Sequence, residues 1–168
     1  YKIMKKIQLF TDSSVNPQKK IGFAAFLLKN SLNTPLEVLQ NSIKHKRFEN
    51  TSSTRLELQS FLWALDEILK EEKDISNIFI EVYTDCQNII SLKNRKEKLQ
   101  NNSYHTTSGK MLSNYDLYIE FFDKTSKLNI EFIKVEGHKR KDIKNEIDNI
   151  FNLVDKSSRS FLRNIMLS

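Results

Sequence analysis

Cysteine is almost absent from this chain of 168 residues, in which Cys86 is the only one. A single thiol excludes an internal disulfide framework and any zinc site built from several cysteines. Glycine and proline are also scarce, at three and two residues, which excludes collagen-like and linker-like chains. Apolar residues make up 39% of the chain and include 11 Phe, so wholesale disorder is excluded as well.

Long apolar runs are missing too. No segment approaches the roughly 20 apolar residues of a membrane-spanning helix, and the basic first eight residues lead into a strand-like segment, unlike a signal peptide. We therefore expect a soluble, cytoplasmic protein of a reducing compartment, without membrane association and without an obligate protein partner, as a monomer.

The charge is mildly basic, with 27 Lys and Arg against 21 Asp and Glu and a net charge of +6. This excess suits a nucleic-acid partner, because basic side chains that neutralise phosphates release counterions. A basic protein with no polyanionic partner has the same composition, so the charge alone leaves both interpretations open.

Apolar periodicity predicts one α/β domain over residues 1–168. The expected strands are residues 6–11, 21–29, 36–44, 75–84 and 129–135. The expected helices follow residues 52–54, open at 85–88, and cover 112–124 and 147–166. The polar, basic residues 93–107 are expected to form a loop or a protruding segment. Three antiparallel strands followed by two parallel ones predict a five-stranded mixed sheet with helices on both faces.

Carboxylates follow two of these strands where each ends. Asp12 comes after residues 6–11, and Asp85 comes after residues 75–84. Sites in open α/β sheets form outside the ends of neighbouring parallel strands, so the two carboxylates could converge there. Either aspartate by itself is more simply explained as the cap of a turn or helix.

A third carboxylate, Glu57, lies in line with Phe61, Ala64 and Ile68 on the apolar face of a predicted helix. Burying it there is costly unless it is paired, protonated or bound to a metal. The alternative is that Glu57 closes a capping box with Thr54. Three acids from three elements with a shared direction favour a Mg²⁺ or Mn²⁺ site, because these ions prefer oxygen ligands.

The last predicted helix adds two candidate acids, Asp148 and Asp155. They are two turns apart, roughly 10 Å along the helix axis, so only one can join a compact site directly. His138 precedes this helix, and a lone histidine is usually an ordinary surface residue.

Five short motifs in this order resemble those of type 1 ribonuclease H, of the RNase H-like superfamily. They are FTDSS with Asp12, TRLELQSFLWAL with Glu57, VYTDCQNII with Asp85, SGKMLSNYDLY, and FIKVEGH with His138. The resemblance extends over nearly the whole chain. It implies endonucleolytic cleavage of the RNA strand of an RNA–DNA hybrid, leaving a 5′-phosphate and a 3′-hydroxyl.

By position, the resemblance implies that Asp12, Glu57 and Asp85 are catalytic ligands of two Mg²⁺ ions, or of Mn²⁺ in their place. For the fourth acid, the pattern VDKSSR at Asp155 fits the family, although Asp148 is closer to the family's usual distance from the histidine. The resemblance gives His138 a role in positioning water or releasing product. A two-metal mechanism is the chemistry that such a set supports.

The same alignment implies contacts of six side chains with the hybrid. They are Ser13, Asn16, Ser52, Ser53, Thr54 and Gln87. Asn16 and Gln87 are the strongest candidates, whereas a plain helix cap explains residues 52–54 equally well. Ser13 stands where the family has glycine, in a turn that the RNA backbone approaches closely.

The basic residues 93–98 resemble a modest version of a protrusion that grips the DNA strand in some family members, and a solvated helix end is the alternative. Two other functions also remain open. A non-catalytic nucleic-acid-binding module with this fold is suggested by Ser13 and by the altered last helix. Another nuclease of the superfamily, such as a junction resolvase or an exonuclease, is the third.

Overall fold

The computed structural model describes residues 4–30, 34–136 and 145–167. They form one five-stranded mixed sheet in the order β3-β2-β1-β4-β5. In this sheet β2 is antiparallel to both β1 and β3, and β4 is parallel to both β1 and β5. The predicted α/β class is therefore confirmed. The elements in chain order are β1 (Lys5–Asn16), β2 (Ile21–Lys29), α1 (Leu36–Asn41), β3 (Lys44–Glu49), α2 (Ser53–Glu71), η1 (Ile75–Asn77), β4 (Ile78–Thr84), α3 (Gln87–Asn101), α4 (Tyr115–Thr125), β5 (Asn129–Lys134) and α5 (Glu146–Leu167).

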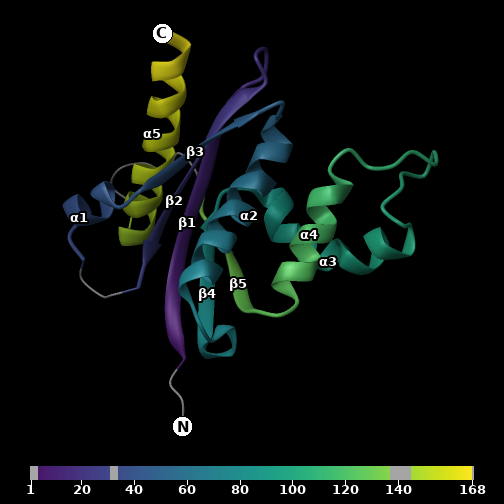
Figure 1. Cartoon of the computed structure of the whole chain (residues 1–168), viewed down its shortest axis with the longest axis horizontal. Helices are drawn as coiled ribbons and strands as arrows, with labels where there is room; N and C mark the ends of the chain where they lie inside the picture. The colour runs from purple at the N-terminus through teal and green to yellow at the C-terminus, as the bar shows by residue number, and fades with distance from the viewer. Residues whose placement is uncertain (1–3, 31–33, 137–144, 168) are drawn as a thin grey trace.

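Helices cover both faces of the sheet (Figure 1). On one face, α2, α3 and α4 pack over a core that includes Phe26, Phe61 and Phe121. On the other, α5 and α1 lie over Phe10 and Tyr83, whose stacked ring centroids are 4.7 Å apart. The central strands are thus buried on both sides, which explains their nearly continuous apolar sequences. None of the helices in the described part of the chain is both long enough and apolar enough to cross a membrane.

The third strand lies later in the chain than its pattern predicts. Residues 36–44 were expected to form it, but α1 occupies most of this segment, with Leu39 its one buried residue. The strand itself is β3, an edge strand that pairs with β2 and with no other strand among the described residues. Its sequence carries Lys44, Lys46 and Arg47, so it lacks the apolar alternation by which strands are recognised.

The helix after β4 is longer than predicted. Residues 93–101 were expected to be loop or protrusion, yet they continue α3 without a break. Ile89, Leu92 and Leu99 are its buried residues, and the last two are seven positions, or two helical turns, apart. One apolar stripe therefore holds the whole helix on the core.

The first turn of α2 excludes a capping-box role for Glu57. Ser52 is the N-cap, and its Oγ accepts a hydrogen bond from Arg55 N at 3.3 Å. Glu57 therefore lies in the second turn and is not the capping-box partner of Thr54, which removes the alternative explanation for this carboxylate.

A glycine brings this end of α2 close to the sheet. A Cβ atom on Gly22 would lie 2.4 Å from Leu56 Cδ2 and 2.8 Å from Ser14 O. Neither distance is tolerable for a methyl group, so only glycine permits this approach of α2 to β1 and β2. The approach also carries Glu57, the neighbour of Leu56, toward the sheet.

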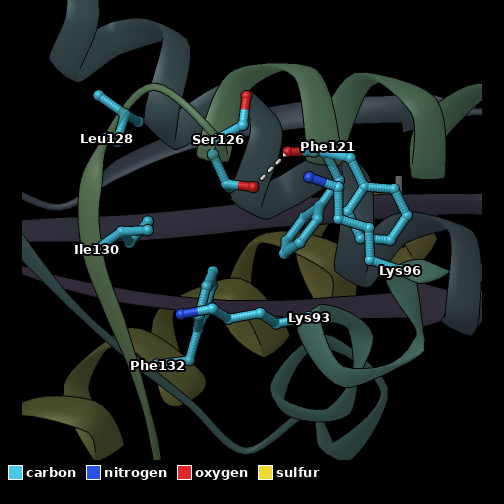
Figure 2. Close-up of a pocket in the computed structure, with 9 residues that line it drawn as sticks. Lys93, Lys96, Phe121, Ser126, Leu128, Ile130 and Phe132 are labelled. Carbon is cyan, nitrogen blue, oxygen red and sulfur yellow. Dashed lines mark hydrogen bonds between the residues drawn. The ribbon is translucent and has the colours of Figure 1, made fainter.

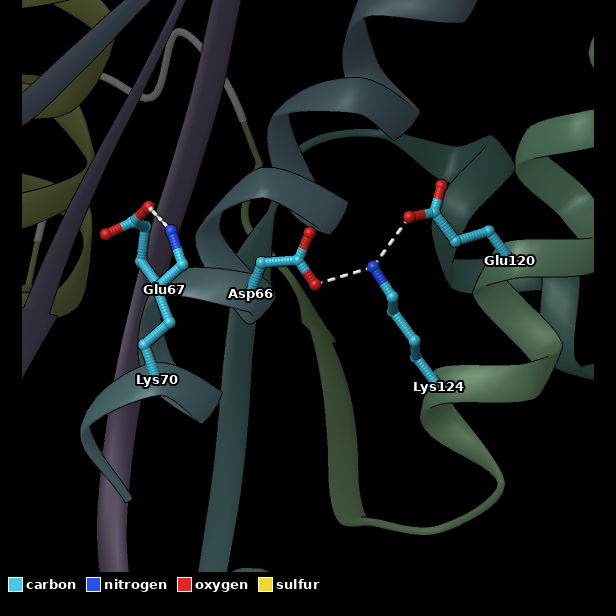
Figure 3. Close-up of polar contacts among 5 residues, drawn as sticks. All are labelled: Asp66, Glu67, Lys70, Glu120 and Lys124. Atoms are coloured by element: carbon cyan, nitrogen blue, oxygen red, sulfur yellow. Dashed lines mark hydrogen bonds and ion pairs between the residues drawn. The ribbon is translucent and has the colours of Figure 1, made fainter. Parts of the chain in front are cut away.

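Ion pairs join α4 to α2 on the outer surface (Figure 3). Lys124 Nζ lies 2.5 Å from Asp66 Oδ1 of α2 and 2.6 Å from Glu120 Oε1 of α4. A separate pair, Lys70 and Glu67, lies within α2. The Lys124 side chain is only 23% exposed, whereas Asp66 and Glu120 are 44% and 39% exposed, so the ammonium group is the shielded partner.

Candidate active site

Two carboxylates lie at the same level of the sheet because their strands are neighbours and parallel. In the register of β1 with β4, Phe10 is opposite Tyr83. Asp12 and Asp85 each follow two residues later, where β1 continues and β4 has just ended. The charge of Asp85 is close enough to help raise the pKa of Asp12.

The last helix brings a third carboxylate to this pair. α5 packs along β1, and the hydroxyl oxygens of Ser158 and Ser14 are 3.0 Å apart. One turn earlier in α5, Asp155 forms a hydrogen bond with the side chain of Asp12. Asp155 also accepts a hydrogen bond from Arg159 Nη2 at 2.7 Å.

Asp148, the other candidate in α5, has a capping role at the start of the helix. Its Oδ2 accepts a hydrogen bond from Asn145 N at 3.1 Å, and its own N–H donates to Asn145 Oδ1 at 2.9 Å. The Asp148 side chain is buried at 7% exposure. Of the two candidates, Asp155 is therefore the one with an identified contact to Asp12.

The crowding of these acids changes the chemistry of Asp12. Burial, the hydrogen bond with Asp155 and the charge of Asp85, in that order, raise the pKa of Asp12 to about 9. With no cation present, Asp12 therefore keeps its proton at neutral pH. A divalent cation would take the place of that proton.

Glu57 reaches the same place from α2. Its Oε2 accepts a hydrogen bond from Cys86 Sγ at 2.9 Å. Burial, followed by this contact with Glu57, raises the pKa of the Cys86 thiol to about 12, so the thiol stays protonated and acts as a donor. Cys86 directly follows Asp85. The turn between β4 and α3 therefore carries Asp85 and contacts Glu57 through Cys86.

One small pocket unites three of the predicted acids. Asp12, Glu57 and Asp85 line it together with residues of β1, α2 and α3. Thr11 also lines it, and its buried Oγ1 has no hydrogen-bond partner among the described residues. Oxygen donors with an unsatisfied hydroxyl suit a hydrated Mg²⁺ or Mn²⁺ ion. The acidic side chains already have protein partners, however. No three His, Cys, Asp or Glu side chains in the described ranges are arranged to hold one ion as they stand.

The predicted hybrid-binding hydroxyls lie at an exposed helix N-terminus. Ser52, Ser53 and Thr54 are all exposed, and two of them contact each other, Ser52 Oγ and Thr54 Oγ1 at 3.4 Å. The first turn of a helix presents free N–H groups that bind anions. Both interpretations of these residues, as helix caps and as phosphate contacts, thus fit one location.

An ion pair beside this helix end was not predicted from the sequence. Arg55 pairs with Asp116 through two hydrogen bonds of 3.1 and 2.7 Å, and donates to Asn114 Oδ1 at 3.3 Å. It thereby fixes the start of α4 next to the start of α2. The motif around Asn114 and Asp116 was the available signal.

Asn16 and Gln87 both have protein partners. Asn16 Oδ1 accepts hydrogen bonds from the main chain of Gln18 and Lys19 at 3.0 and 3.1 Å, and its Nδ2 lies 3.2 Å from the sulfur of Met166. The amide of Asn16 is therefore already engaged in the turn after β1. Ser13 lies in β1 itself, opposite Ala24.

Within the described ranges, only one end of the Gln87 amide has a hydrogen-bond partner. Its Oε1 accepts a hydrogen bond from Lys134 Nζ at 2.9 Å, which directs the Nε2 donor away from the lysine. Lys134 is the last residue of β5, opposite Thr84, and sequence reasoning missed it. Its position at the end of a strand beside β4 was the only signal.

The basic residues 93–98 lie along α3 and not on a separate protrusion. Lys93 and Lys96 flank a pocket of about 230 Å³ that is otherwise lined mainly by apolar residues of α4 and β5, such as Phe132 (Figure 2). Arg95 donates to Asn88 Oδ1 at 2.7 Å and lies over the Tyr118 ring. His138 lies outside the described residues, so its predicted role is not addressed by the geometry.

Comparison with known sequences gives a consistent result. The model of the RNase H family matches residues 4–152, a range that includes Asp148 and ends before Asp155. A protein named Ribonuclease H from Caldicellulosiruptor saccharolyticus is 29% identical over 164 residues, which cover 95% of this chain and 98% of that protein. Another of that name, from Prosthecochloris aestuarii, is 30% identical over 160 residues, which cover 92% and 99%.

Solved structures share the fold. The crystal structure of LC9-RNase H1, described as a type 1 RNase H with the type 2 active-site motif, superposes with a TM-score of 0.66 at 17% identity, over 94% of this chain and 74% of that one. A foamy viral protease-reverse transcriptase in complex with an RNA/DNA hybrid gives a TM-score of 0.63 at 10% identity, over 92% and 19%.

Proposed function

This chain belongs to the ribonuclease H family, and from that premise we propose that it is a metal-dependent endonuclease that cleaves the RNA strand of RNA–DNA hybrids, leaving a 5′-phosphate and a 3′-hydroxyl. The observation that supports this most directly is the contact between Asp12 and Asp155 beside Asp85. Because these acids lie close together, ionising all of them is unfavourable, and only a bound proton or cation relieves the repulsion between their charges.

In the proposed site, Asp12, Glu57, Asp85 and Asp155 hold two Mg²⁺ ions. Bound there, the ions supply the activation of a water and the stabilisation of the leaving 3′-oxygen. Mn²⁺ has the same preference for oxygen ligands and is expected to substitute. His138 is proposed to position water or assist product release.

The chain's other residues bind and orient the hybrid. The exposed hydroxyls of residues 52–54, at the N-terminus of α2, bind a backbone phosphate. The Nε2 donor of Gln87, which has no partner among the described residues, contacts acceptor atoms on base edges in the minor groove. We assign contacts with the RNA strand to Ser13, within β1, and to Asn16, at its end, and Asn16 must exchange its contact with Met166 for one with RNA.

The test is cleavage of a labelled hybrid by the pure protein, with and without Mg²⁺, in parallel with duplex RNA, duplex DNA and a four-way junction. We expect cleavage of the hybrid's RNA strand only, dependent on Mg²⁺. Asp12→Asn and Asp85→Asn should abolish turnover while hybrid binding persists. Binding without any cleavage would instead identify a non-catalytic module, and junction or duplex cleavage another nuclease.

The choice of fourth acid is tested in the same assay. Asp155→Asn should reduce turnover as severely as Asp12→Asn. Asp148→Asn should instead lower thermal stability, because it weakens the cap of α5. The reverse result would transfer the metal-ligand role to Asp148.

A further inference from the structure

The carboxylate of Glu57 is held on one side by a thiol. Cys86 Sγ donates to Oε2 at 2.9 Å, and Cys86 is only 6% exposed. The bond engages Oε2 and leaves Oε1 for another partner. Because Cys86 follows Asp85 directly, the same turn carries one proposed ligand and orients a second that comes from a different helix.

A hydroxyl group of β1 lines the same pocket. Thr11, immediately before Asp12 in β1, is 2% exposed, and its Oγ1 has no hydrogen-bond partner within the described ranges. Buried hydroxyls nearly always bond to protein or to ordered water. The pocket that Thr11 shares with Glu57 has a free volume of about 10 Å³, which is room for one water molecule.

The other polar groups of this pocket suit the same water. Ser60 Oγ donates its proton to Leu56 O at 2.7 Å, which leaves its oxygen as an acceptor. Thr84 Oγ1 accepts from Cys86 N at 3.1 Å. The pocket is thus lined by enough polar groups to supply the two to four partners that ordered buried waters have.

We propose that Cys86 and Thr11 are positioning residues for Glu57, Cys86 through its direct hydrogen bond and Thr11 through one bound water. This inference rests on the proposed function, in which Glu57 is a metal ligand. A carboxylate that is already oriented loses less rotamer freedom when an ion binds, which is why groups behind a ligand affect metal affinity. Both positioning residues are chain neighbours of other proposed ligands, so the network aligns acids from β1, α2 and the β4–α3 turn.

The test measures Mn²⁺ affinity by titration calorimetry in the absence of nucleic acid. Cys86→Ala should weaken binding roughly tenfold, the lower end of the effect of lost outer partners. Cys86→Ser should restore most of the affinity, because a hydroxyl donates the same bond. Thr11→Val, which keeps the shape but not the hydroxyl, should also weaken binding. Ser91→Ala is the control, because Ser91 lies on α3 and bonds only to Asn88 O in the described contacts.

Two further measurements separate positioning from general damage. Hybrid binding in EDTA should be equal in all these variants, since none of them removes a proposed hybrid contact. In the metal-free protein, the infrared S–H band of Cys86 should shift when Glu57 is replaced by Gln. An unshifted band would contradict the thiol contact in solution.

The outcomes distinguish this inference from the proposed function. Unchanged Mn²⁺ affinity in Cys86→Ala, together with lost binding in Asp12→Asn, would overturn the positioning role and leave the metal site standing. Undiminished binding in Asp12→Asn would overturn both. A Thr11→Val protein that melts at higher temperature with unchanged affinity would show that the hydroxyl is simply buried without a bridging water, and would overturn the part assigned to Thr11.

Discussion

At the scale of single residues, Asp12 is the group whose behaviour depends most on its surroundings. Its pKa of about 9 lies far above the value near 4 of an unfolded carboxyl. Between those two values the folded, metal-free protein holds a proton that the unfolded chain releases. Its stability should therefore fall as the pH rises from about 4 to about 9.

Replacing this carboxyl by an amide removes the effect. We expect Asp12→Asn to stabilise the metal-free protein at pH 7 by up to about 4 kcal/mol, because pH 7 lies about three units above the unfolded pKa and each unit corresponds to about 1.4 kcal/mol. For a chain of this size each kcal/mol raises Tm by about 2–4 °C. The advantage should vanish below about pH 4, where both states of the parent protein are protonated. Thermal melts in EDTA across this range test it, and a constant difference between the two proteins would contradict the raised pKa.

Metal binding should expel the same proton. If a divalent ion displaces the proton of Asp12, metal affinity should rise by up to about tenfold per pH unit between pH 6 and 9. Mg²⁺ titrations in weakly buffered solution should release close to one proton per binding event. Asp12→Asn, which is expected to lose metal binding as well as this proton, should release almost none and gives the background of the titration.

The residues of the site were predictable to different degrees. The closeness of Asp12 and Asp85 could be predicted because their strands are parallel neighbours. The predicted end of the first strand was wrong, however, because β1 extends to Asn16 and Asp12 lies within it, whereas Asp85 does follow β4. The contact of Cys86 with Glu57 could not, because it depends on how closely α2 approaches α3. The engagement of Asn16 by Met166 joins residues 150 positions apart, which no local pattern encodes.

At the scale of elements, the start of α2 depends on Gly22. Gly22→Ala would bring a methyl group against Leu56 and the main chain of Ser14, and overpacking of this kind costs roughly 1–3 kcal/mol. We expect lower thermal stability and reduced hybrid cleavage, since the displaced helix carries Glu57. Melting curves and initial rates measure the two effects. A variant with parental values in both would show that the sheet and helix yield without cost.

The position of α4 on α2 depends on charge. Lys124→Met should lower the free energy of unfolding by about 0.5–1 kcal/mol, and the loss should shrink in high salt. Lys127→Met is the control, because Lys127 and Asp123 are both largely exposed and 4.0 Å apart. Urea denaturation at two salt concentrations distinguishes them. Equal effects of the two substitutions would contradict a special role for Lys124.

The elements that were predicted well from the sequence are those that bury one or both of their faces, because burial leaves a recognisable apolar pattern. β2 and β4 are buried on both faces, so their continuous apolar runs identify them. β3 was misplaced because its stability comes from its neighbours: it pairs along β2, and His45 stacks on Phe161 of α5 with ring centroids 3.7 Å apart. Such contacts leave no periodicity in the strand itself.

At the scale of the whole molecule, the sheet divides the protein into two unequal halves (Figure 1). α2, α3 and α4 build the larger core, and α5 is the main cover of the other face. The acids meet where the two halves join, at the level where β4 ends and β1 continues beside it. Residues from both halves must therefore be in place before the site exists, which ties its assembly to the folding of the entire chain.

The exposed edge of β3 has one more consequence. An edge strand presents unpaired main-chain groups on which a second chain could add, and this is a common start of aggregation. Two copies meeting there would bring Lys44, Lys46 and Arg47 of one against the same bases of the other, and like charges on paired strands repel. The basic residues that make this strand hard to recognise in the sequence also oppose pairing of two β3 edges.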